Sequence, residues 1–456
     1  MRRYLVFATA SLGLLMYAID STVVAVAFPH LIKELGTNLL WAGWTISIYY
    51  IGVTTAMPLA GNLSDSFGRK RVFVVSLILF TASSLVCGLA PNIYTLIVFR
   101  FLQGVGGASF LPTASGIATD HFPENRERVI GLLSSIFNMG SIIGPNLGGW
   151  IVSRYTWRYV FYINLPIGLG LIASIMLLLK GSKQTLRPSI DAAGASYFSG
   201  AILFLMFGLN LIGESLAARS LFIAGALLFV SLFLALLFLR QEKTQDEPIL
   251  EPVLLKSKPF LAANLVNMIM GAGFFGLFAT VPLYAMSVHG LSALASGVIL
   301  TPRSVGVILA SVATSFLLKR WGYRRPLIVG LVTVSCATIL LAPNLIAMGV
   351  RESGFGVAEV LAFLILFCGI GAGIANPAAN NACIELLPGK VATIVGLRGM
   401  FRTVGGALGI SLITFVLHLS ADPRSGFGVI FICFGLALSC IIPLVFLMPT
   451  GRRSWG

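Results

Sequence analysis

The sequence predicts an all-α polytopic membrane protein with fourteen transmembrane helices, arranged as two six-helix copies around an inserted central pair. Three observations carry this prediction. The composition is more apolar than that of a soluble protein, fourteen apolar runs are long enough to cross a bilayer, and one half of the chain repeats the other at a constant offset.

The composition excludes a soluble chain. Of the 456 residues, 57% are hydrophobic and only 10% are charged, and the mean hydropathy is +0.94. Soluble domains carry about 25% charged residues, so this chain has too little polar surface to face water. The net charge of +15 does not indicate nucleic-acid binding, because the basic residues lie in short runs between apolar segments and form no patch or arm.

Fourteen apolar runs of about 20 residues each match the length that spans the hydrocarbon core of a bilayer. The connections between them are short, and the longest polar one covers about 240–259. In order along the chain, the runs are 4–28, 40–62, 72–90, 92–118, 128–153, 157–180, 191–212, 218–240, 260–288, 293–317, 325–345, 355–380, 391–418 and 427–449.

Lysine and arginine set the predicted orientation. With the N-terminus inside, the inner connections hold 21 of the 31 Lys and Arg residues, the outer ones hold six, and four lie within helices. This bias places both termini in the cytoplasm. Arg2 and Arg3 could open a signal peptide, but the apolar run continues past Asp20 to Pro29 without a convincing cleavage site.

The sequence repeats at an offset of 265 residues, so that residues 104–132 align with residues 369–397. Shared apolar composition would not align loop prolines and several glycines in one register. We therefore expect three parts: an N-terminal six-helix bundle (1–180), an inserted helix pair with its linker (181–258) and a C-terminal six-helix bundle (259–456). The aligned pairs include Gly104 with Gly369, Pro112 with Pro377, and Pro123 with Pro388.

The connection between the second and third runs, "GNLSDSFGRKR" (61–71), combines two turn-forming glycines with an acid and a basic cluster. An ordinary positive-inside loop is one explanation. The stretch also resembles the signature G-x-x-x-D-x-x-G-R-K/R of the major facilitator superfamily. That resemblance implies a gate that changes with conformation, made of Gly61, Asp65, Gly68, Arg69 and Lys70. The second copy keeps Gly322 but has Lys319 in place of the acid.

The stretch "GSIIGPNLGGW" (140–150) repeats glycine every fourth residue around a proline. Glycines at this spacing allow helices to approach closely, and a proline inside a helix frees a backbone carbonyl. A packing face alone would explain them. The stretch also resembles the superfamily's antiporter motif, G-x-x-x-G-P-x-x-G-G, which implies a proton-coupled exporter. The matching residues are Gly140, Gly144, Pro145, Gly148 and Gly149.

Three further stretches and the inserted helix pair resemble the fourteen-helix drug/proton antiporter branch of the same superfamily. They are "WTISIY" (44–49), "WRYVFYINLPIG" (157–168) and "TPRSVG" (301–306). The resemblance covers essentially the whole chain. It implies two six-helix repeats of the major facilitator type and transport by alternating access.

Asp20 lies inside the first apolar run, where a carboxylate costs about 2.5 to 3.5 kcal/mol on insertion scales. At 1.5 Å per residue, Asp20 is roughly 24 Å from the inner end of its helix and Arg100 roughly 12 Å from the outer end of its own, so both lie at similar heights. The stretch "IDSTVVAVAFP" resembles the branch signature D-x-T-V-V-N-x-A-x-P. "RFLQG" matches the superfamily motif R-x-x-Q-G through Arg100 and Gln103.

These features predict that Asp20 carries the coupled proton and that Arg100 is its partner. The coupling role is what the resemblance implies, whereas the shared depth comes from the sequence. The alternatives are a carboxylate neutralised at an interface and an arginine that snorkels to the membrane surface.

The remaining polar residues deep in the predicted bundle are candidates for a substrate cavity. This region contains four arginines, one of which is Arg100, and a single acid, Asp20. The positive net charge favours neutral, zwitterionic or anionic amphiphiles over dications. Some of the arginines could instead bind backbone carbonyls between helices. The cavity candidates are Gln103, Asn264, Asn267, Arg303, Asn376, Asn380, Arg398 and Arg402.

The function predicted is proton-coupled efflux of small drug-like amphiphiles, with the bilayer, protons and a small-molecule substrate as partners. The expected protein is a monomer in the cytoplasmic membrane of a bacterium, driven by the proton gradient without a cofactor. The sequence has no catalytic cluster and no metal-ligand spacing. The rivals are a metabolite exporter or proton symporter within transport, and a membrane enzyme or assembly scaffold outside it.

Overall fold

The computed structural model describes residues 2–37, 39–179, 191–214, 217–243, 256–291 and 293–450. These residues form helices and their connections, with no β-strand in the described ranges. The all-α prediction is therefore confirmed for the part of the chain described. The predicted boundary near 180 and the basic residues at 180–190 and 452–453, used above for orientation, lie outside the described residues.

The N-terminal half holds the first nine helices. In chain order they are α1 (Arg2–Val23) with its 3-10 extension (Val24–Ala27), α2 (Phe28–Glu34), α3 (Leu39–Phe67), α4 (Arg69–Leu89), α5 (Ile93–Gly107), α6 (Phe110–His121), α7 (Arg126–Arg154), α8 (Tyr159–Tyr162) and α9 (Asn164–Leu178). The short turn η2 (Pro123–Asn125) precedes α7.

The central pair is α10 (Ala192–Glu214) and α11 (Ala218–Glu242). The C-terminal half follows. It consists of α13 (Lys258–Gly271), a π-helical stretch (Ala272–Leu277), α14 (Phe278–His289), α15 (Ala293–Val298), α16 (Thr301–Trp321), α17 (Arg324–Leu340), α18 (Pro343–Ser353), α19 (Val357–Leu386), α20 (Val391–Leu419), α21 (Pro423–Cys440) and the 3-10 stretch Ile442–Leu447.

Each predicted apolar run coincides with a helix or with consecutive helices, but the count of fourteen spans is not confirmed. Among the described residues, 11 helices are long and apolar enough to cross a membrane, or up to 12 if α17 and α18, which meet at 86°, form one span. This count does not include α3, which is rich in aromatic and hydroxyl residues. It also does not include the run from α13 to α14. That run is divided by the π-helical stretch, so neither helix reaches the full length alone.

The internal repeat recurs in the helix boundaries. Both α7 and α20 have 29 residues, and they begin and end 265 residues apart. Their predecessors differ, because α5 and α6 are separate helices while α19 runs unbroken over 30 residues. The two copies thus share the bounds of one helix pair, whereas the segments before it differ in continuity.

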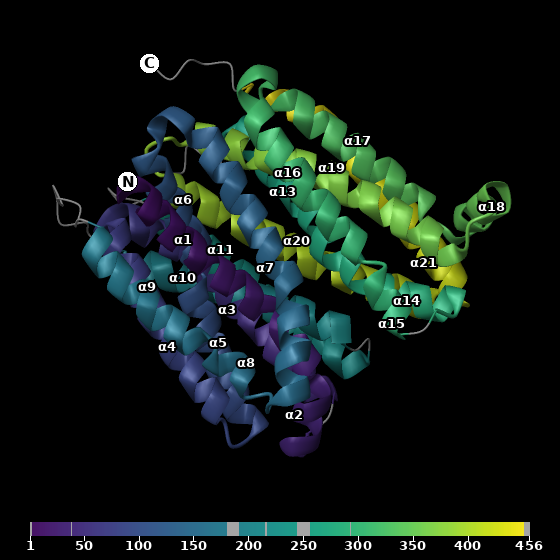
Figure 1. The fold of residues 1–456 in the computed structure, drawn as a ribbon, viewed down its shortest axis with the longest axis horizontal. Helices are drawn as coiled ribbons and strands as arrows, with labels where there is room; N and C mark the ends of the chain where they lie inside the picture. Colours follow the sequence, from purple (N-terminus) through teal and green to yellow (C-terminus); the bar gives the residue numbers. More distant parts are fainter. Residues whose placement is uncertain are drawn as a thin grey trace.

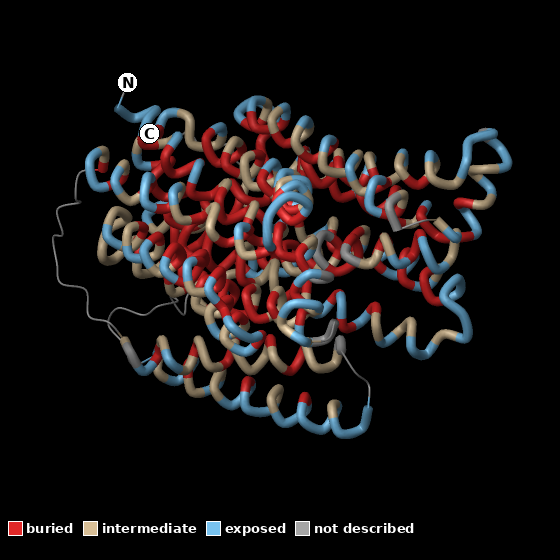
Figure 2. The backbone as a smooth tube through the Cα atoms, turned by 60° about the horizontal axis from the view of Figure 1, so that its bottom comes forward, coloured by how far each residue is buried: buried red, intermediate tan, exposed pale blue. Residues whose placement is uncertain are grey.

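The two halves lie side by side, and the central pair lies behind them in the view of Figure 1. The helix α10 bridges the halves. The rings of Trp44 on α3 and Phe207 on α10 are tilted at 31° with centroids 5.7 Å apart, and Ser411 Oγ of α20 donates to the Leu209 carbonyl oxygen at 2.7 Å. Outward-facing Phe222 and Phe229 of α11 are 79% and 70% exposed, as expected for a surface that faces lipid. Buried residues gather in the interior between the helices (Figure 2).

Candidate functional site

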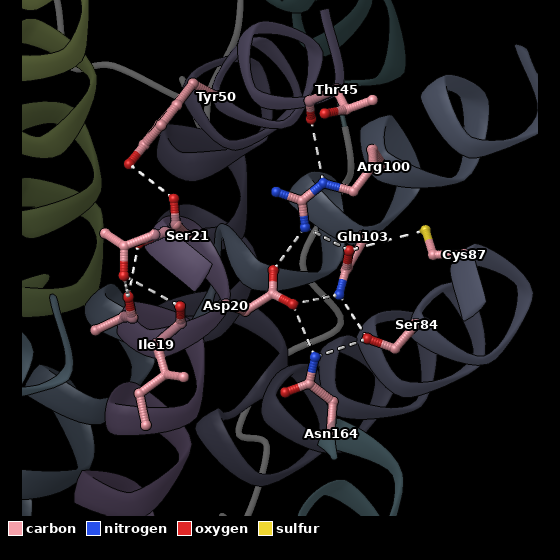
Figure 3. Close-up of polar contacts among 12 residues, drawn as sticks. Ile19, Asp20, Ser21, Thr45, Tyr50, Ser84, Cys87, Arg100, Gln103 and Asn164 are labelled. Carbon is pink, nitrogen blue, oxygen red and sulfur yellow. Dashed lines mark hydrogen bonds and ion pairs between the residues drawn. The ribbon is translucent and has the colours of Figure 1, made fainter. Parts of the chain in front are cut away.

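A buried ion pair joins α1 to α5, at the residues that the sequence singled out. Arg100 Nη1 donates to Asp20 Oδ2 at 2.7 Å, and both side chains are fully buried (Figure 3). The other carboxylate oxygen, Oδ1, accepts from Gln103 Nε2 at 2.9 Å and from Asn164 Nδ2 at 2.7 Å. Two helices, α5 and α9, therefore supply three donors to one carboxylate, which offsets much of the cost of burying it.

Arg100 is held by more than its acid. Its Nε donates to the Thr45 carbonyl oxygen at 3.1 Å, and its Nη1 also donates to Gln103 Oε1 at 2.8 Å. The guanidinium carbon lies 4.0 Å from the centroid of the Tyr49 ring, a distance that favours attraction between cation and ring. An arginine tied in this way cannot snorkel to the surface, so the alternative of an interfacial side chain does not describe it.

A second set of polar residues completes this cluster, and sequence reasoning missed it. Ser84 Oγ on α4 accepts from Gln103 Nε2 at 2.5 Å and from Asn164 Nδ2 at 3.0 Å. Asn164 stands in the stretch at 157–168 that supports the family resemblance, and an isolated amide in an apolar helix is a usable signal. Ser84 gave no such signal, because serine bonds its own helix backbone too often to be informative. Thr45 takes part through its backbone carbonyl oxygen, which every residue has.

A cavity of about 840 Å³ lies beside this cluster, between the two halves. Residues of α1, α3, α7, α15, α16 and α20 line it. Ser21, Thr22 and Tyr50 belong to the lining, whereas Asp20 does not. The Tyr50 Oη atom lies 3.5 Å from the Ser21 carbonyl oxygen. These residues form a thin wall between the buried carboxylate and the cavity.

Two of the predicted cavity residues, Arg303 and Arg402, line this cavity. The described lining contains no aspartate or glutamate. Gln103 instead belongs to the Asp20 cluster. Arg398 is buried beside the cavity, where its Nη2 donates to Asn376 Oδ1 at 2.7 Å.

The predicted cavity amides lie outside this lining. Asn264 and Asn267 donate to carbonyl oxygens one turn earlier in α13, at 3.0 and 2.7 Å. Asn267 also lies 3.3 Å from Cys383 Sγ on α19. Asn376 and Asn380 are buried on α19. In the part of the chain that the structure describes, no three His, Cys, Asp or Glu side chains come together as a metal site.

The glycines of the 140–150 stretch bring α7 against α1. An added Cβ at Gly140 would lie 2.6 Å from the Ala18 Cβ, and one at Gly144 would overlap Thr22 Oγ1. Gly148 packs in the same way on Val23, while Gly149 leaves more room, with its nearest atom 3.9 Å away on Val26. Pro145 lies inside α7 and lines the cavity.

At one end of the molecule the two halves touch directly. We call it the closed end, and it holds residues 61–70, 120–126, 319 and 388–393. Asp65 Oδ2, at the end of α3, accepts from the Thr393 backbone N–H at 2.8 Å and from its hydroxyl at 2.9 Å. Asp65 thus caps the N-terminus of α20, where backbone donors have no helical partner. Gly61 makes the approach possible, since a Cβ there would overlap the Ala392 carbonyl oxygen.

The basic residues of the same loop hold this end together. Arg69 Nη1 lies 3.2 Å from Asp65 Oδ1, and Arg69 also pairs with Asp120. Lys70 Nζ donates to the carbonyl oxygens of Met176 and Leu179 at 2.8 and 2.6 Å. Gly68 turns the chain between α3 and α4 with φ +91°, which only glycine adopts readily.

Two more contacts cross between the halves at the closed end. Lys319 Nζ donates to the Glu124 carbonyl oxygen at 2.7 Å, and Arg126 Nη2 donates to the Pro388 carbonyl oxygen at 3.3 Å. The cavity, by contrast, reaches exposed residues such as Val298 at the other end of the bundle. The structure is therefore closed at one end and hollowed toward the other.

We expect Asp65→Ala to slow transport without changing which compounds are chosen. Loss of a helix cap costs about 0.5–2 kcal/mol, and this cap exists only while the closed end is shut, so the equilibrium shifts away from that state. Initial rates for two unrelated substrates would fall together in reconstituted vesicles. Asp65→Asn, which keeps one acceptor oxygen, would fall less. A changed ratio between the two substrates at unchanged turnover would contradict a gate role.

Comparisons with known proteins place the chain in a family. A model described as Major Facilitator Superfamily matches residues 10–194 and 192–410. The chain is 32% identical over 419 residues to the Multidrug transporter protein MdtP of Bacillus subtilis, covering 91% of this chain and 76% of the relative. It is also 32% identical over 409 residues to Multidrug resistance protein 3 of the same organism, covering 88% and 77%.

Among solved structures, the fold is similar to the human organic anion transporter MFSD10 (TETRAN), with a TM-score of 0.72 over 97% of this chain and 99% of that one. The identity is 15%, so this likeness concerns the fold alone.

Proposed function

The chain belongs to the Major Facilitator Superfamily of membrane transporters, and we propose that it exports drug-like amphiphilic compounds by exchanging them for protons. It is a multi-pass transporter of small molecules, not an enzyme. The multidrug names of the two B. subtilis relatives described above support drug-like substrates. The single observation that carries the proton coupling is the ion pair of Asp20 and Arg100 in a fully buried site beside the cavity.

Protonation of Asp20 would change what this cluster can hold. The ionised carboxylate accepts from three donors, and the neutral acid loses much of its attraction for the Arg100 guanidinium. Because these donors come from α5 and α9, a change at Asp20 alters how α1 packs on them. The glycine contacts of α7 with α1 connect the same helix to the cavity wall. Proton binding thus biases the position of α1, and α1 lines the substrate cavity.

The proposed cycle alternates between two states. The state described here is shut at the closed end, through Asp65 and the basic residues near it, and has its cavity toward the other end. In the opposite state these contacts would break and the cavity would face the cytoplasm. Substrate would enter there and leave from the state described. An inward proton yields about 2.3 kcal/mol per 100 mV of membrane potential, which can drive export uphill.

We place fourteen spans in the cytoplasmic membrane of a bacterium, with both termini inside and the chain acting as a monomer. The eleven apolar helices would be joined by three more spans: α3, the run from α13 to α14, and the bent pair α17–α18. The chain then divides into bundles 1–180 and 259–456, with 181–258 as the inserted pair. Contacts from Arg3 to Glu124, and from Glu124 to Lys319, put the start of α1 at the closed end.

Cysteine tags test this topology. Single cysteines near residue 2, within 180–190 and near residue 452 are all expected to react with membrane-impermeant reagents only from the cytoplasmic side, because an even number of spans returns the chain to the side where it began. A tag at Arg351, on the exposed end of α18, serves as the outside control. External labelling at 452 would exclude an even count.

A direct test of the function uses inside-out vesicles that contain the full-length protein. After the lumen has been acidified, an exported compound added outside should drive protons out of it. A panel of drug-like compounds should therefore dissipate the gradient, and vesicles without the protein provide the background. Gradient loss with none of the panel but with one metabolite would favour a dedicated metabolite exporter. Substrate and proton moving in the same direction would contradict antiport.

A further inference from the structure

The charge of the cavity wall indicates which compounds it holds. Arg303 on α16 and Arg402 on α20 line the cavity, and its described lining has no acidic residue. Asp20 is next in sequence to the lining residues Ser21 and Thr22. It does not line the cavity itself, and it forms an ion pair with Arg100. Among the residues that the structure describes, the cavity lining therefore presents two cations from the C-terminal half and no carboxylate.

A third cation strengthens this field. Arg398 lies one helical turn before Arg402, and both Arg303 and Arg398 are near enough to repel the Arg402 guanidinium electrostatically. Asn376 Oδ1 accepts from Arg398 Nη2 at 2.7 Å and lies 3.4 Å from Arg402 Nη1. An amide oxygen orients these groups but neutralises neither. In a low-dielectric site, such a cluster attracts an anion strongly and disfavours a cation.

The Arg303 guanidinium lies over an aromatic ring, with its carbon 4.2 Å from the Phe278 centroid. The opposite wall, on α7, contributes apolar Phe137, Ile142 and Pro145. It also contributes three uncharged polar side chains, which donate to carbonyl oxygens of their own helix: Asn138, Ser141 and Asn146. The described lining thus has a cationic side in the C-terminal half of the protein and an uncharged side, with apolar patches on α7, in the N-terminal half. A ligand with a charged head and an apolar body matches both sides.

We propose that this cavity binds amphiphilic organic anions, with a carboxylate or sulfonate against Arg303 and Arg402 and the apolar body against α7. The proposal rests on the proposed export function, of which it names the substrate class. Monovalent organic anions are then the preferred ligands, neutral analogues bind more weakly, and quaternary ammonium compounds bind least. The bidentate geometry of guanidinium with carboxylate or sulfonate gives the head group its orientation.

Three probes with one fluorophore test this preference. They are dansylate, which is a sulfonate anion, the neutral dansylamide, and a dansyl compound that carries a trimethylammonium group. Binding to the full-length protein in nanodiscs is measured by energy transfer from its tryptophans. We expect dansylate to bind at least about tenfold tighter than the cation, the size of effect that a charge-assisted hydrogen bond supplies. Added salt should weaken binding of the anion.

Substitutions locate the effect. Arg303→Gln and Arg402→Gln should each weaken dansylate binding about tenfold while leaving dansylamide nearly unchanged, which also shows that the variant is folded. Arg402→Lys should keep part of the affinity. Arg351→Gln, at an exposed arginine outside the cavity, is the matched control and should behave as wild type.

The outcomes separate this inference from the export proposal. Equal or tighter binding of the trimethylammonium probe by the wild-type protein would overturn the anion preference, even if the Gln variants do not fold. So would an anion-to-cation ratio that is unchanged in both Gln variants. Proton release by cationic compounds in vesicles, without anion preference, would keep proton-coupled export and reject only the substrate class. Anion preference without proton release would reject the coupling and keep the site.

Discussion

Asp20→Asn is expected to reduce proton-coupled export to the background of vesicles without the protein. Asparagine has nearly the same shape but cannot release a proton, so the driving force no longer reaches the substrate. Its amide oxygen can still accept from Arg100 or from Gln103 and Asn164, but its NH₂ group then faces a donor. We therefore expect the variant to insert into the membrane with reduced thermal stability. The measurement is substrate-induced loss of a proton gradient in inside-out vesicles.

Two variants complete this experiment. Asp20→Glu keeps the titrating group on a longer side chain and should retain partial activity. Glu352→Gln removes an exposed acid on α18 and should leave the rate unchanged. Uphill export by Asp20→Asn at the wild-type rate would show that another group carries the proton.

Arg100→Met is expected to destabilise the protein more than any loss of a surface charge. Removal of one partner from a buried ion pair typically costs about 3–5 kcal/mol, because the remaining charge is left in a low-dielectric site. Here the remaining charge is Asp20, which becomes neutral by taking up a proton and then no longer responds to the gradient. Both the melting temperature and proton-coupled export should therefore fall.

The double variant with Asp20→Asn and Arg100→Met separates the two effects. It buries no charge in this cluster, so its melting temperature should lie above that of Arg100→Met alone, while export stays at background. Arg351→Met is the matched control. If Arg100→Met melted like the wild type, or if the second substitution restored no stability, the energetic role assigned to this pair would be wrong.

The pairing of Asp20 with Arg100 was predictable because helix geometry converts sequence position into depth. Two charges at the same depth in hydrocarbon have few partners other than each other. The rest of the cluster was not predictable in this way. Ser84 and Thr45 meet Arg100 and Gln103 only through the packing of α3, α4 and α5, and depth alone does not say which faces of these helices meet.

For the cavity too, the sequence indicated where some residues lie but not which groups they would contact. Sequence reasoning placed Arg303 and Arg402 in the cavity, and the structure puts both in its lining. It also named Asn264 and Asn267, which bond to the backbone of their own helix. An amide has both a donor and an acceptor, so it can satisfy itself locally. The Arg402 guanidinium, with five donors and no acceptor, is less easily satisfied by its own helix.

The fold itself followed from composition and periodicity, except for the number of spans. Apolar runs located the helices well, because every run coincides with helical residues. They could not show that the π-helical stretch would divide α13 from α14, or that α17 and α18 would meet at 86°. Such breaks depend on how neighbouring helices re-satisfy the backbone, which a hydropathy pattern does not report.

The wall of Ser21, Thr22 and Tyr50 between Asp20 and the cavity affects how well a cell keeps its proton gradient. If the carboxylate were exposed to water on each side of the membrane in turn while the protein held no substrate, it would carry protons down their gradient. Such a proton leak would dissipate the gradient without any export. Each such proton dissipates about 2.3 kcal/mol per 100 mV. In the state described, the carboxylate is buried and paired with Arg100, and it does not line the cavity. A substrate-free copy of the proposed antiporter therefore does not use up the proton gradient. A cell could then keep many copies in its membrane between exposures to toxic compounds.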